Sequence, residues 1–238
     1  MPLPKITAPT YEMVLPSSGR KIKYRPFLVK EEKLLIIAME SEDQKQINEA
    51  LKNVLSNCIL TRGTKVEKMS TFDIEYLFLN IRGKSVGETV EVLITCPDDN
   101  KTKVPVVIDL DAIKVVKNPD HERDIKLDQN LTLRMKYPSL DEFIKNNFDV
   151  ENIGVTESFD MIIACMDQVY NEEESWKSSD CTKKELSDFL DQLNSKQFKE
   201  IEKFFETMPK LSHTVKVVNP ETKVESEILL EGLASFFE

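Results

Sequence analysis

The chain has only two histidines, six glycines and one tryptophan in 238 residues. His121 and His213 are not part of an HExxH motif, so the sequence lacks the usual zinc ligands of a metallohydrolase. Both lie far from any cysteine in sequence, which disfavours a Cys-His nucleophile pair. The few glycines form neither a GxxxxGK(S/T) loop nor a GxGxxG turn, the usual backbone cradles for phosphate. We therefore expect a protein that is not an enzyme, with no catalytic residues and no cofactor.

The four cysteines have no short spacing between any two of them. Cys58 and Cys165 fall on apolar helical faces, which favours buried hydrophobic side chains over ligands. The turn Cys96-Pro97-Asp98-Asp99 is similar to half of a zinc knuckle, but a structural zinc site needs four ligands. The acidic pair in this turn lacks the alternating ligands of a calcium loop, which favours a solvated turn. We expect reduced thiols and no metal site.

Long apolar runs are also missing. The longest, LLIIAM at 34–39, is far too short to span a bilayer, and the amino end lacks the apolar core of a signal peptide. We expect no membrane segment and a location in the cytoplasm where the chain is made.

Negative charge predominates and is unevenly spread. The formal net charge is -10, and residues 121–238 hold 14 Lys and Arg against 25 Asp and Glu. Such a field repels phosphate backbones, so a nucleic-acid partner is disfavoured. The acidity either keeps the protein soluble or forms an acidic docking face.

Large aromatic side chains in polar or terminal segments are the candidate partner-interface residues. Trp176 lies in the polar segment 171–181, where it either anchors the loop onto its own helices or lies exposed in an interface. Phe236 and Phe237 end the chain and either close a core or are buried only in a complex.

What is present is an alternation of helical and strand periodicities, which predicts an α+β fold. Apolar residues recur at helical spacing over 198–208, Pro209 ends that helix near Met208, and a hairpin turns at Asn219-Pro220-Glu221. Residues 70–110 give a similar helix and hairpin, with a predicted helix stop at Gly83 and a turn at 96–100.

The likeness extends upstream, because 21–35 and 131–145 both read as a strand, a proline and a helix. We interpret the chain as two related halves, each with β-hairpins flanking a small helical cluster; the alternative is a chance likeness between common pieces. We predict an extended arm at 1–9 and a first half at 10–117. A linker at 118–122 leads to a second, acidic half at 123–238.

Local signals refine three helices. Ser70 with Asp73, and Thr182 with Glu185, match the capping box that starts a helix. Apolar residues at helical spacing from Phe159 through Cys165 to Val169 predict a helix across this range.

Three segments resemble the T4-type bacteriophage baseplate hub protein family: YRPFLVKEEK (24–33), FDIEYLFLNIRGKSVGE (72–88) and FKEIEKFFETMPKL (198–211), the last followed by NPETK and LEGLASFF. They are spread over nearly the whole chain. The resemblance implies a non-enzymatic structural or assembly protein of the central hub of a contractile tail baseplate. One alternative is an assembly chaperone for a hub or tape measure protein, absent from the mature virion, and another is an uncharacterised metal-dependent enzyme.

The resemblance also implies partners and a place. The partners would be other baseplate hub and tail proteins, with the tape measure protein among the candidates. The protein would lie in the host cytoplasm during assembly and, as a subunit, in the virion tail baseplate. Open edges of the predicted hairpins could take an added strand from a partner. The oligomeric state is not set by the sequence.

Overall fold

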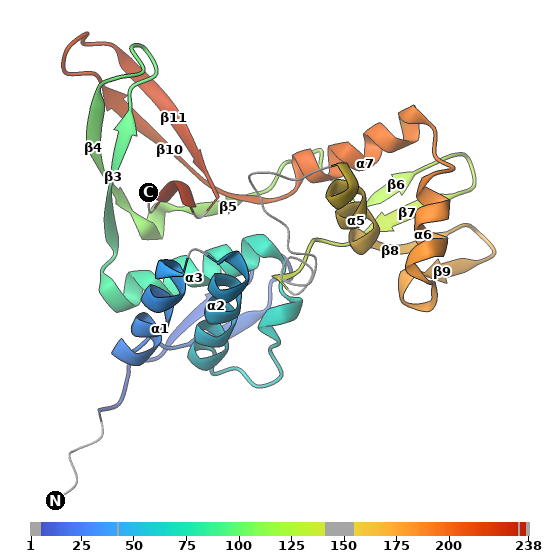
Figure 1. Cartoon of the computed structure of the whole chain (residues 1–238), viewed down its shortest axis with the longest axis horizontal. Coiled ribbons are helices and arrows are strands. Elements are labelled where there is room, and N and C mark those ends of the chain that lie inside the picture. The colour runs from blue at the N-terminus through green and yellow to red at the C-terminus, as the bar shows by residue number, and fades with distance from the viewer. Residues whose placement is uncertain (1–5, 42, 141–154, 233, 237–238) are drawn as a thin grey trace, which may run out of the picture. The chain divides into compact units, whose positions relative to one another are not determined.

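The computed structural model describes residues 6–41, 43–140, 155–232 and 234–236. They form six α-helices and eleven β-strands in small antiparallel sheets, which confirms the α+β class (Figure 1). Contacts divide the chain into two units. Unit 1 comprises residues 1–116 with 210–238, and unit 2 comprises Lys117–Pro209.

Unit 1 begins with a hairpin and three helices and ends with two longer hairpins. Its elements are β1 (Tyr11–Val14), β2 (Lys21–Tyr24), α1 (Val29–Glu40), α2 (Gln44–Cys58), η1 (Val66–Lys68), α3 (Thr71–Val86), β3 (Thr89–Thr95), β4 (Lys103–Asp109), η2 (Leu110–Ala112), β5 (Lys114–Val116), β10 (Lys210–Val218), β11 (Glu225–Glu231) and η4 (Ala234–Phe236).

Helix α3 departs from two local predictions. It runs past Gly83 to Val86, and Gly83 lies buried inside the helix. A Cβ added at this position would be 3.7 Å from Leu110, an ordinary van der Waals distance, so Gly83 is a helical residue packed near Leu110 and does not stop the helix. The predicted capping box is also wrong: Ser70 makes no cap hydrogen bond, and Asp73 instead accepts hydrogen bonds from the backbone N–H of Ser17 (3.0 Å) and from its hydroxyl.

The two long hairpins of unit 1, β3–β4 and β10–β11, pack against each other. Alternate residues of each strand point inward, so the apolar residues of both hairpins share one core. Strand β10 also pairs with β5, in the order β11-β10-β5. The shared core contains Val92, Ile94, Ile108, Leu110, Ile113, Leu211, Val215, Val217, Leu79 and Phe236.

Unit 2 is a four-stranded antiparallel sheet, in the order β6-β7-β8-β9, with helices packed on it. Its core joins Leu133 and Val169 of the sheet to Ile162 of α5 and to Ile201 and Phe204 of α7. The elements are β6 (Asp124–Lys126), β7 (Thr132–Met135), α5 (Val155–Cys165), β8 (Met166–Tyr170), β9 (Ser175–Lys177), η3 (Ser178–Asp180), α6 (Lys183–Leu190) and α7 (Ser195–Thr207).

For unit 2, the predicted helix start and helix end are confirmed, and one predicted helix is too long. The Thr182–Glu185 capping box is confirmed, and α7 ends at Thr207 before Met208 and Pro209 as expected. The helix predicted across 159–169 is wrong in its second part, because α5 ends at Cys165 and Met166–Tyr170 is strand β8. Pairing of β8 with β7 on one side and β9 on the other overrides the local helical spacing.

The grouping of segments differs from the predicted halves. The C-terminal hairpin β10–β11 belongs to unit 1, although it follows unit 2 directly in sequence. The two hairpins interpreted as equivalent parts of separate halves thus share one core. Their common origin stays a prediction, as do the proposed boundaries of the halves.

Candidate partner-binding surfaces

Trp176 lies on β9, the edge strand of the unit 2 sheet. Register places it opposite Val169, which is opposite Leu133, which is opposite Ile125. The other three side chains of this cross-strand row are buried, whereas Trp176 is 44% exposed. Within the described residues, β9 pairs only with β8. The indole therefore ends an apolar row at a sheet edge that is open to an added strand.

The two terminal phenylalanines have different places. Phe236 is fully buried in the core of unit 1, where it packs with the two long hairpins. Its side chain closes the core in this structure and is not offered to a partner. Phe237 lies outside the described residues.

Helix α1 presents an unexpected apolar surface. Its buried residues are Glu31 and Ala38, while Val29 is 80% exposed and Met39 is 66% exposed. The exposed apolar face of α1 consists of Leu28, Val29, Leu34, Ile36, Ile37 and Met39. In a helix that follows the usual pattern these side chains would face the core.

A buried ion pair lies on the side of α1 opposite these exposed residues. Glu31 accepts hydrogen bonds from Arg25 Nη2 (3.0 Å) and from the backbone N–H of Leu28 (2.7 Å). Burial alone would raise the pKa of Glu31, but these hydrogen bonds outweigh it and lower the pKa below its ordinary value. The buried carboxylate is satisfied by these partners, and the opposite side of α1, which carries the apolar residues, lies exposed.

The local pattern predicts a helix after Pro26 but does not indicate which side of that helix faces the core. One usable signal was Arg25 placed just before Pro26, six residues ahead of Glu31, which allows a local ion pair at the start of the helix.

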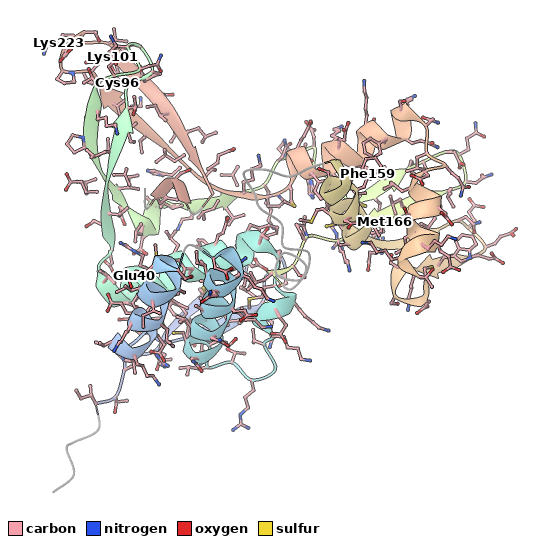
Figure 2. The ribbon with its side chains drawn as sticks, in the orientation of Figure 1. Glu40, Cys96, Lys101, Phe159, Met166 and Lys223 are labelled. Atoms are coloured by element: carbon pink, nitrogen blue, oxygen red, sulfur yellow. The ribbon has the colours of Figure 1, made fainter. Side chains whose placement is uncertain are left out.

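The tips of the long hairpins carry a cluster of hydrogen-bonded polar side chains. Asn219 is buried, and its Nδ2 donates to Asp98 Oδ1 (3.1 Å) and Oδ2 (3.0 Å) and to Asp99 Oδ2 (3.0 Å). Thr222 and Thr102 donate their hydroxyls to the same two carboxylates and lower their pKa values. Figure 2 shows both tips at Cys96, Lys101 and Lys223. The cluster joins two turns 121 residues apart.

One pocket of unit 2 brings charged side chains together. A pocket of about 630 Å³ on unit 2 is lined by Asp160, Asp167 and Lys183 among others, and Lys183 Nζ is 2.8 Å from Asp160 Oδ1. Its described lining includes neither a histidine nor a cysteine. Cys58 is buried, and burial raises its pKa to about 11, which keeps it a thiol.

Among the residues of the described ranges, no group of three or more His, Cys, Asp or Glu side chains is placed to hold a metal ion. Nor does any helix in those ranges combine the length and apolar character needed to cross a bilayer. What the structure does present is exposed apolar side chains on α1 and at the β9 edge, which are surfaces suited to protein partners.

Comparison with known proteins shows the family to which the chain belongs. Residues 8–238 match the family model described as T4 bacteriophage base plate protein, and the chain belongs to this family. It is thus a baseplate protein with a structural role, whose partners are other proteins of the phage tail or baseplate. No curated protein and no solved structure matches the chain.

Proposed function

We propose that the protein is a non-enzymatic subunit or assembly factor of the central hub of the contractile tail baseplate. It acts by protein-protein contacts in the host cytoplasm during assembly. The observation that carries the proposal is the family match over residues 8–238, on a chain whose hub-like segments lie at 24–33, 72–88 and 198–211.

The β9 edge with Trp176 is the proposed contact for another tail protein. Unit 2 holds 12 Lys and Arg against 21 Asp and Glu, a formal net charge of -9, whereas unit 1 holds 20 against 21. An extended partner segment with basic residues would pair with β9, cover the indole and meet the acidic residues Glu172 to Glu174 beside it.

Co-expression with candidate hub and tape measure proteins, followed by size-exclusion chromatography, tests the proposal. A complex with at least one of them is the expected result. W176A should weaken that complex, while V224A, which truncates another half-exposed apolar residue, should leave it unchanged. If the chain elutes alone with every tail component, the hub proposal fails.

The second candidate is a chaperone for a hub or tape measure protein. The exposed apolar face of α1 favours it, because such a surface can cover an apolar segment of a client. Quantitative mass spectrometry of purified particles separates the two functions. A near-stoichiometric amount supports a hub subunit, and absence from particles supports a chaperone.

A further inference from the structure

The exposed face of α1 has a stripe in which charge and apolar residues are arranged symmetrically. Val29, Lys33, Ile36, Ile37 and Glu40 recur at helical spacing, and all five are exposed. Lys33 lies one turn before the two isoleucines and Glu40 lies one turn after them. From Lys33 to Glu40 the stripe therefore has a positive end, an apolar centre and a negative end.

We propose that α1 pairs with α1 of a second copy of this chain in antiparallel orientation, about a two-fold axis between Ile36 and Ile37. In that register Lys33 of each copy lies opposite Glu40 of the other. The four isoleucines meet at the centre, with Leu34 and Met39 at the two sides. An isologous contact of this kind requires a self-complementary surface, and the stripe provides one.

Charge decides the orientation. A parallel pair would place Lys33 beside Lys33 and Glu40 beside Glu40, and like charges at close range oppose association. The antiparallel pair forms the favourable contact between Lys33 of one copy and Glu40 of the other twice. Glu40 stands at the exposed C-terminal end of α1 (Figure 2), so its carboxylate is available to a second molecule.

The expected affinity follows from the size of the contact. Twelve residues of helix are about 18 Å long, so the contact is far smaller than a standard interface of about 1,600 Å². The dimer should thus be weak when the protein is alone, with dissociation in the micromolar range or above. Inside an assembly that brings two copies together, the same contact would be formed more completely.

Sedimentation velocity of the full chain over a concentration series tests the pairing. Wild type should form dimers as concentration rises. K33E or E40K alone should raise the dissociation constant about tenfold or more, since each change is felt twice in a symmetric dimer. The double variant K33E/E40K should restore association, and so should an equal mixture of the K33E chain with the E40K chain.

Two further variants complete the design. I36S/I37S should abolish the dimer without altering the circular dichroism spectrum, because both side chains are about half exposed in the single chain. K103E, which makes the same charge change on β4, should have no effect. A chain that stays monomeric over the whole series, or a dimer indifferent to K33E and E40K, would overturn the proposal. Either result leaves the hub function untouched, because that function is measured with other tail proteins.

Discussion

At the scale of single residues, a few polar side chains that are buried or partly buried connect segments of this protein. Asn219 joins the tips of the two long hairpins, Glu31 joins the start of α1 to Arg25, and His121 contacts the end of α7 through Thr207. Each forms hydrogen bonds to residues outside its own helix, strand or turn. These are positions where removal of one partner leaves another polar group unpaired.

N219A should lower the stability of unit 1 by about 2 kcal/mol, because it removes the donor shared by Asp98 and Asp99 and the acceptor for the Glu221 backbone N–H. Thermal unfolding followed by circular dichroism measures the change. K101A is the control, since Lys101, on the β3–β4 tip that Asn219 contacts, bonds Asp99 through its backbone N–H, which the substitution keeps. Equal melting temperatures for the two variants would contradict the role of Asn219.

Stability of unit 2 should fall as pH falls below 6.5. His121 Nδ1 lies 2.9 Å from Thr207 Oγ1 and Nε2 lies 3.1 Å from Tyr137 Oη, and burial, with Arg123 nearby, lowers its pKa. The unfolded chain therefore takes up a proton at a pH where the folded chain does not, so the stability present above 6.5 is lost as pH falls towards the folded pKa.

Urea unfolding at about pH 7.5 and about pH 5.5 checks this sign. Trp176, the single tryptophan, gives a fluorescence signal that belongs to unit 2. H121Q should reduce the difference between the two pH values. If the urea concentration at the midpoint of wild-type unfolding rises on acidification, the prediction is wrong.

At the scale of elements, α1 is held by its charged side and leaves its apolar side free. E31Q should lower stability by about 2–4 kcal/mol, since it leaves Arg25, whose side chain is 16% exposed, without its ionic partner. E32Q, one position along the same helix and partly exposed, is the control and should change little. Urea unfolding of unit 1 followed by circular dichroism at 222 nm, the usual helix signal, measures both. A loss no larger than that of E32Q would show that the pair does not hold α1.

At the scale of the whole molecule, unit 2 is inserted between two strands of unit 1. Val116 at the end of β5 is the register partner of Lys210 at the start of β10, so the chain leaves and re-enters unit 1 at adjacent residues. Unit 2 has its own core. This arrangement indicates that unit 1 does not need the inserted residues to close its sheet.

Replacement of residues 117–209 by Asn-Gly should give a chain that still folds. Asn-Gly favours the tight turn that joins antiparallel strands, and Val116 and Lys210 are already paired. Calorimetry should show one cooperative transition, with near-ultraviolet circular dichroism of a packed core. A broad, non-cooperative transition would show that unit 1 depends on unit 2.

Local features of the chain could be predicted from the residues alone: the α+β class, the end of α7 before Pro209, the Thr182 capping box and the final hairpin are all consequences of periodicity and turn chemistry within a few residues. The sequence also carried the family likeness, because that resides in linear motifs. Tertiary structure alone decided the rest. The pairing of strand β8 with β7, the packing of Gly83 near Leu110 and the packing of the C-terminal hairpin with β3–β4 all depend on partners far away in sequence, and a local pattern does not record which partner a residue will meet.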